Sequence, residues 1–72
     1  MTSTTPQQFG QLAATIGKHL PLEICQSRAG FYVGTKDVDG LPVSRESAEY
    51  WPRREQAEGA LRGGTFTQKR YP

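Results

Sequence analysis

The stretch from Phe31 to Trp51 reads FYVGTKDVDGLPVSRESAEYW, and in it two β-prone runs are separated by the turn sequence DVDG. The first run is aromatic and β-branched, which are residue types that favour strands. Within the turn, aspartate tolerates the required geometry and Gly40 takes a positive φ without penalty. Pro42 lacks a backbone donor, so the returning strand, LPVSRES, is expected at a sheet edge. The stretch therefore predicts a β-hairpin.

The same acidic turn matches part of a calcium-binding loop, whose pattern is D-x-[DN]-x-[DN]-G-x5-E. Asp37, Asp39, Gly40 and Glu46 occupy four of the five defined places. Thr35 stands where the first aspartate is required, and such a loop joins two helices rather than two strands. The sequence therefore favours a hairpin turn, and we expect no metal ligand.

The N-terminal part of the chain has the signals of a helix over residues 6–19. Thr5 is a suitable N-cap, Pro6 suits the first helical position, and Gln8 completes a capping box. Pro21 ends the pattern. One apolar stripe at helical spacing follows the cap: Phe9, Leu12, Ala13, Ile16 and Leu20.

Four further segments have recognisable local signals. Residues 22–26 alternate in the manner of a short first strand, and residues 27–30 are typical of a turn. Residues 53–64 predict a second helix that ends at a double glycine, with Glu55 and Glu58 early and Arg62 late, as the helix dipole favours. Residues 65–70, TFTQKR, predict a final strand. The inward residues expected here are Ala57, Ala60, Leu61 and Phe66.

Together these segments predict an α+β fold: a small antiparallel sheet of three to four strands packed against two helices, in the order α-(β)-β-β-α-β. We expect residues 1–72 to form a single small domain, with residues 1–4 and 70–72 disordered. A thin core is expected from Phe9, Leu12, Ile16, Leu20, Leu22, Ile24, Phe31 or Tyr32, Val33, Val43, Tyr50 or Trp51, Ala57, Leu61 and Phe66.

The length and composition indicate the cellular compartment of the chain and the ways in which so small a fold can be stabilised. A chain of 72 residues buries only about 60% of its unfolded surface, so a partner or a homodimer stays open as extra support. Cys25 is the only cysteine, which excludes an intramolecular disulfide and suits a reducing compartment. Neither a signal peptide nor a membrane span is visible. We expect a soluble, cytoplasmic protein without membrane association.

Basic residues gather in the last third of the chain. Residues 1–50 carry four basic and five acidic side chains, whereas residues 51–72 carry five basic and two acidic ones. Arginine and lysine neutralise phosphates and exposed aromatics stack on bases, so this part of the chain is a candidate for weak nucleic-acid binding. The residues concerned are Trp51, Arg53, Arg54, Arg62, Lys69, Arg70 and Tyr71.

Catalytic groups are sparse. Cys25 and the only histidine, His19, form a conceivable nucleophile–base pair, but no oxyanion-hole element accompanies them. The carboxylates of Glu46 and Glu49, or those of a pair on the second helix, lack the apolar surroundings that raise a pKa. The sequence therefore predicts a protein that is not an enzyme and has no cofactor.

Residues 30–70 contain GFYVGT, DGLPVSRESAEYW, RREQAEGAL and GTFTQKR in succession. This order resembles short uncharacterised bacterial proteins found in proteobacterial genomes, phages and mobile elements. The resemblance implies a hairpin, a helix and a last strand in that order, and it implies no activity for any residue. For a phage- or element-borne protein, inhibition or modification of a host machine would be one form of action.

The sequence thus leads to a small non-enzymatic binding or adaptor module that acts through a protein–protein interface, its protein partner unidentified. The expected surface is the exposed sheet face and the hairpin, because arginine and aromatic residues are enriched in interface hot spots. Nucleic-acid binding by the basic C-terminal third is the alternative. The residues proposed to bind a partner are Tyr32, Arg45, Trp51, Arg53, Arg54, Arg62 and Lys69.

Overall fold

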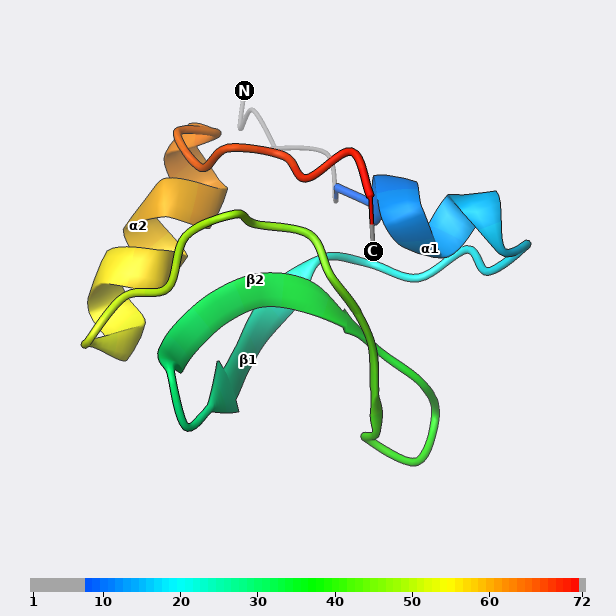
Figure 1. Cartoon of the computed structure of the whole chain (residues 1–72), viewed down its shortest axis with the longest axis horizontal. Helices are drawn as coiled ribbons and strands as arrows, with labels where there is room; N and C mark the ends of the chain where they lie inside the picture. Colours follow the sequence, from blue (N-terminus) through cyan, green and yellow to red (C-terminus); the bar gives the residue numbers. More distant parts are fainter. Residues whose placement is uncertain (1–7, 72) are drawn as a thin grey trace, which may run out of the picture.

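The structure is a computed structural model, which describes residues 8–71 (Figure 1). Its elements are α1 (Gln11–Thr15), β1 (Glu23–Ser27), β2 (Gly30–Lys36), β3 (Pro42–Arg45) and α2 (Arg54–Gly63). The strands form one antiparallel sheet in the order β1-β2-β3, which confirms the α+β class. Neither helix is long and apolar enough to cross a membrane.

The β1–β2 hairpin confirms the predicted first strand and its turn. Cys25 pairs with Tyr32 and Ser27 pairs with Gly30, so Arg28 and Ala29 form a two-residue connection. Gly30 has a φ of +131°, a conformation that side-chain-bearing residues rarely adopt.

The predicted β2–β3 hairpin is also confirmed. Thr35 pairs with Ser44, and β3 is an edge strand that begins at Pro42, as expected of a residue without a backbone donor. In the turn, Asp37 Oδ1 accepts the N–H groups of Asp39 at 2.9 Å and Leu41 at 3.0 Å. This local hydrogen bonding makes the turn a compact, ordered tip.

Beyond β3 the chain bulges away from β2 and then returns to it. Five residues lie between Arg45 and Trp51, whereas only two residues of β2 lie between their partners Gly34 and Phe31. Within the bulge the hydroxyl of Ser47 accepts the N–H of Val33 at 3.0 Å, so a side chain replaces a backbone partner. The bulge (residues 46–50) therefore inserts extra side chains between two paired positions.

The core lies between the sheet and α2, where Leu22, Ile24, Val33 and Ala57 form its centre. Ala57 is fully buried, and its small side chain allows α2 to approach the sheet closely. The helix begins after Arg53, whose N–H donates to Gln56 Oε1 at 3.2 Å, and Gly64 ends it in the left-handed region. The second helix is thus confirmed. The partly buried residues around this core are Phe31, Trp51, Leu61 and Phe66.

The first helix is much shorter than predicted. Thr5 and Pro6 lie outside the described residues, and the predicted extent of 6–19 is wrong because the helix covers only Gln11–Thr15. Before it, the N–H of Gly10 donates to the carbonyl of Leu20 at 2.9 Å, so the chain is extended where a helix was expected. Two members of the predicted core stripe, Phe9 and Ile16, are consequently exposed.

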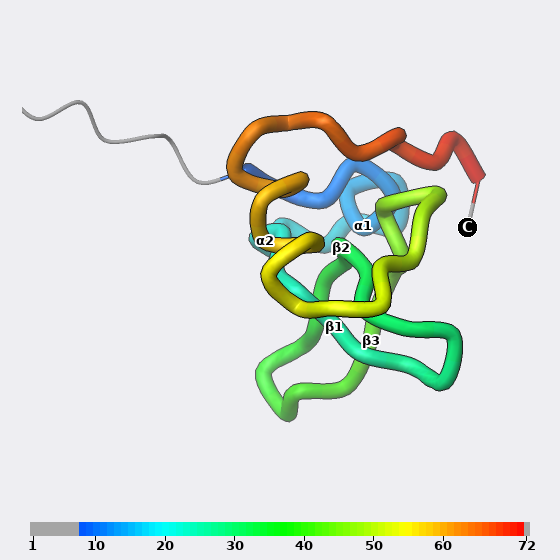
Figure 2. Tube along the Cα trace, turned by 90° about the vertical axis from the view of Figure 1, so that its left-hand side faces the viewer, coloured from blue at the N-terminus to red at the C-terminus, as the bar shows by residue number. Residues whose placement is uncertain are grey.

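The predicted final strand is wrong as well. In residues 65–71, which we call the C-terminal segment, Gln68 forms one isolated bridge with Ser47 and no strand is present. Figures 1 and 2 show the C-terminal segment running from the end of α2 across the molecule to α1. Arg70 and Tyr71, expected to be disordered, are described and exposed, whereas residues 1–4 and Pro72 lie outside the described residues.

Candidate functional site

The run Ser44-Arg45-Glu46-Ser47 sends its side chains in two directions. Ser44 pairs beside Thr35 on the face of the sheet that carries Val33, whereas Arg45 pairs beside Gly34 on the opposite face. The inward members of the run form a buried polar network, and the outward member, Arg45, lies on a surface.

Glu46 is the centre of the buried network. It is 0% exposed, and its carboxylate accepts the backbone N–H groups of Leu12 at 2.9 Å and Ala13 at 3.1 Å. Ser44 Oγ donates to it at 2.6 Å and Gln68 Nε2 at 2.8 Å. One carboxylate therefore joins α1, β3 and the C-terminal segment.

The protonation of Glu46 follows from these contacts. Burial alone raises the pKa of the carboxyl, but the hydrogen bonds from Leu12, Ser44, Gln68 and Ala13 outweigh it and hold the pKa below its usual value of 4.5. Glu46 is thus ionised at neutral pH and fully occupied as an acceptor. The carboxylate lone pairs that a calcium ligand or an acid–base group would use are therefore taken by these four donors.

Glu49 attaches the C-terminal segment at a second point. Its carboxylate accepts the N–H of Thr67 at 2.9 Å and the hydroxyl of Thr67 at 2.7 Å. Burial raises the pKa of this carboxyl, but the hydrogen bonds from Thr67 outweigh burial and hold the pKa below its usual range. Two ionised carboxylates therefore hold the C-terminal segment, together with the backbone hydrogen bonds of its single bridge, from Ala48 N–H to the Thr67 carbonyl at 2.8 Å and from Lys69 N–H to the Glu46 carbonyl at 2.7 Å.

On the face turned away from α2, three side chains are stacked. The guanidinium of Arg45 lies 4.6 Å from the centre of the Tyr50 ring, and the Tyr50 ring meets Tyr32 edge-on at 5.8 Å between centroids. Tyr50 is 39% exposed, but Tyr32 is only 6% exposed. Arg45 is half-buried, and Tyr32, expected both as a core alternative and as a partner-binding residue on an exposed face, is buried.

The burial of Tyr32 depends on its neighbour Gly34. A Cβ at Gly34 would lie 2.8 Å from Tyr32 Cε2, so the ring lies over the glycine. Burial, together with the nearby Cys25, raises the pKa of the Tyr32 hydroxyl. Tyr50 was expected only as one of two alternatives for the core. No periodic pattern pairs it with Arg45, because Tyr50 belongs to the bulge that follows Arg45.

The predicted basic and aromatic residues do not form one surface. Trp51 is half-buried and packs against the core, and Arg54 pairs with Glu58 at 3.4 Å. Arg53 and Arg54 flank the start of α2 and Arg62 lies in its last turn, eight residues or about 12 Å further along the axis. Lys69 belongs to the C-terminal segment. These placements divide the basic residues among three separate regions.

Cys25 and His19 have different surroundings. The Cys25 side chain is 2% exposed, and burial raises the pKa of its thiol, which disfavours the reactive thiolate. The His19 ring stacks on Phe9, with 4.0 Å between centroids. In residues 8–71 no group of three or more metal-ligating side chains could hold an ion.

Comparisons with protein-family models, with curated proteins and with solved structures found no match. The function is therefore argued from the geometry of the chain alone.

Proposed function

We propose that this chain is a small, non-enzymatic binding module of the cytoplasm that recognises a protein partner through Arg45 and Tyr50. The observation that carries the proposal is the stack of Arg45 on Tyr50 at 4.6 Å, supported from below by Tyr32. Tyrosine and arginine are the residue types that dominate interface hot spots. A side chain already held in place loses less entropy on binding, so the stack is preorganised for a partner.

The tip of the β2–β3 hairpin is a second exposed feature that we include in the proposed surface. Val38 is 98% exposed and Leu41 is 60% exposed. Their backbone is fixed by the hydrogen bonds to Asp37 Oδ1, so these apolar side chains are presented on an ordered turn. Apolar groups held in this way add buried area at an interface without a large ordering cost.

We propose no catalytic activity because the candidate acid–base and nucleophilic side chains have pKa values and contacts that make them unreactive at neutral pH. Glu46 and Glu49 are engaged as acceptors, and their lowered pKa values make them poor proton donors at neutral pH. The Cys25 thiol is buried with a raised pKa and is therefore a poor nucleophile.

Nucleic-acid binding by the basic C-terminal third has less support as a general function. A groove that follows a phosphate backbone needs a continuous row of cations. Here Arg54 is paired with Glu58, and the arginines of α2 are divided between its two ends.

Site-specific photo-crosslinking in cells that express the chain tests the proposal. A benzophenone side chain is introduced at Tyr50 or at Val38, and as a control at Arg62, which is also exposed, on α2. We expect a discrete adduct of defined mass from positions 50 and 38, and none from position 62. Analytical ultracentrifugation of the purified chain then shows whether the adduct contains a second copy.

Two results would overturn this assignment. The first is the same adduct pattern from position 62 as from position 50, which would indicate non-specific contact. The second is the lack of any adduct from positions 50 and 38 while both variants remain folded.

A further inference from the structure

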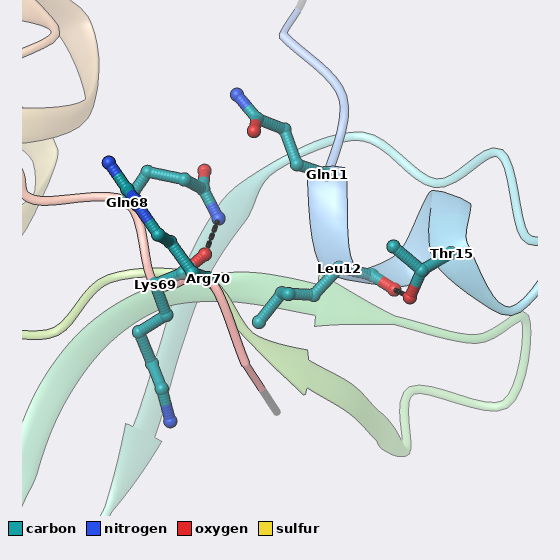
Figure 3. A pocket seen from close by; sticks show the side chains of 6 residues that line it. All are labelled: Gln11, Leu12, Thr15, Gln68, Lys69 and Arg70. Carbon is teal, nitrogen blue, oxygen red and sulfur yellow. Dashed lines mark hydrogen bonds between the residues drawn. The ribbon is translucent and has the colours of Figure 1, made fainter.

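A pocket of about 480 Å³ lies between α1 and the C-terminal segment (Figure 3). This volume is within the range of about 300–1,000 Å³ that small-molecule sites occupy. Its apolar floor is the buried Leu12. The lining residues are Gln11, Leu12, Thr15, Gln68, Lys69 and Arg70.

The lining is cationic and contains no acidic side chain. Gln68 Nε2 is occupied by Glu46 at 2.8 Å and by the carbonyl of Lys69 at 3.0 Å. Thr15 Oγ1 donates to the carbonyl of Leu12 at 2.6 Å. The side-chain donors left for a ligand are therefore those of Gln11, Lys69 and Arg70, and among the described residues neither cation takes part in an ion pair.

The two cations differ in direction. In Figure 3 the side chains of Gln11, Gln68 and Arg70 extend toward the upper side of the view, whereas Lys69 extends toward the lower side. Arg70 thus shares its side of the C-terminal segment with two carboxamides. The hydroxyl oxygen of Thr15 and the carbonyl oxygen of Gln68 remain as acceptors. The Thr15 hydroxyl hydrogen and the Gln68 Nε2 hydrogens are already donated elsewhere.

We propose that this pocket binds a phosphate group, with the guanidinium of Arg70 and the carboxamide of Gln11 as its donors. A planar guanidinium matches phosphate oxygens in a bidentate manner. A phosphate monoester has a second pKa of about 6 and is largely dianionic at neutral pH, so its charge favours a lining that has cations and no carboxylate. The nearest acidic contact, Glu46, is buried and its charge is compensated by four donors.

The test is an NMR titration of the ¹⁵N-labelled chain with inorganic phosphate, with sodium chloride adjusted to keep the ionic strength constant. We expect saturable shifts at the side-chain amides of Gln11 and Gln68 and at the backbone of Thr15. Arg70→Gln and Lys69→Gln form a matched pair, since each removes one positive charge from adjacent exposed or half-exposed positions.

Arg70→Gln should raise the dissociation constant about tenfold or more, as loss of a charge-assisted contact does, and Lys69→Gln should change it by about twofold or less. Shifts that grow linearly without saturation, or equal losses in the two variants, would overturn the proposal. A parallel titration with a short single-stranded DNA identifies the source of the phosphate. A lower dissociation constant for the DNA than for inorganic phosphate, with shifts at the same residues, indicates a nucleic-acid backbone. Spectra that the DNA leaves unchanged indicate a small phosphate ester.

Discussion

Glu46 Oε1 lies 2.9 Å from the backbone nitrogen of Leu12, a residue 34 positions earlier in the chain. The contact matters because α1 has no cap of its own: Gly10, at its N-cap position, carries no side chain. A carboxylate from the end of β3 therefore takes the role that a local serine or aspartate usually has. The same carboxylate holds Gln68, so the fold depends on one buried acidic residue.

The first prediction concerns the substitution Glu46→Gln. A glutamine keeps one acceptor oxygen but places an NH₂ group against backbone donors, and buried donors without partners are costly. We expect the free energy of unfolding in urea to fall by about 2–4 kcal/mol. The matched control is Glu55→Gln on the exposed surface of α2, where a change within about 0.5 kcal/mol is expected. Equal effects of the two substitutions would show that the network does not stabilise the fold.

The second prediction is acid sensitivity. The folded-state pKa values of Glu46 and Glu49 lie below the usual 4.5, so the unfolded chain takes up protons first as the pH falls. Their stabilisation is complete above about pH 4.5 and is lost as the pH drops through the folded-state values. Urea unfolding at several pH values should show a declining stability below that point.

The Glu46→Gln variant is the control for this acid effect. Because it lacks the buried carboxylate, the difference in unfolding free energy between it and the parent chain should shrink as the pH falls. A difference that stays constant between neutral and strongly acidic pH would contradict the assignment of the effect to Glu46.

The third prediction compares two glycines. A Cβ at Gly10 would lie 2.5 Å from Thr35 Cγ2 and 2.7 Å from Glu46 Oε2, whereas a Cβ at Gly59 in α2 meets nothing within 4 Å. Gly10→Ala should therefore destabilise the chain by about 1–3 kcal/mol through overpacking. Gly59→Ala should stabilise it by up to about 1 kcal/mol through helix propensity. Thermal unfolding monitored by circular dichroism distinguishes the two, and a stabilising Gly10→Ala would refute the close approach.

The hairpins and α2 could be predicted because their signals are local. The Asp37–Gly40 turn and the left-handed Gly64 at the end of α2 are fixed by residues within one turn of themselves. The structure of the α1 region, in contrast, is decided by contacts between residues that are distant in the sequence. Its apolar stripe has helical spacing, but pairing of residues 8–10 with residues 20–22 outweighs the weak helix propensity around Gly10.

The remaining errors also arise from contacts between distant residues. Thr67 donates its N–H to the Glu49 carboxylate, so the backbone pairing of the C-terminal segment stays limited to the single Ser47–Gln68 bridge and does not become the predicted strand. Tyr32 is buried where its ring lies over Gly34 and meets Tyr50, a residue of the bulge, edge-on. The polar Ser44-Arg45-Glu46-Ser47 run was a visible signal, but only the fold shows which members face inward.

The central claim is that two neighbouring residues of the Ser44–Ser47 run have different roles: Glu46 stabilises the fold, and Arg45 contacts the partner. The most direct measurement combines crosslinking yield from a benzophenone at Val38 with urea unfolding, for Arg45→Ala. We predict a loss of most of the adduct, with a stability change of about 0.5–1 kcal/mol, the size of an exposed cation–π contact. An unchanged adduct yield, or a destabilisation as large as that of Glu46→Gln, would contradict the account.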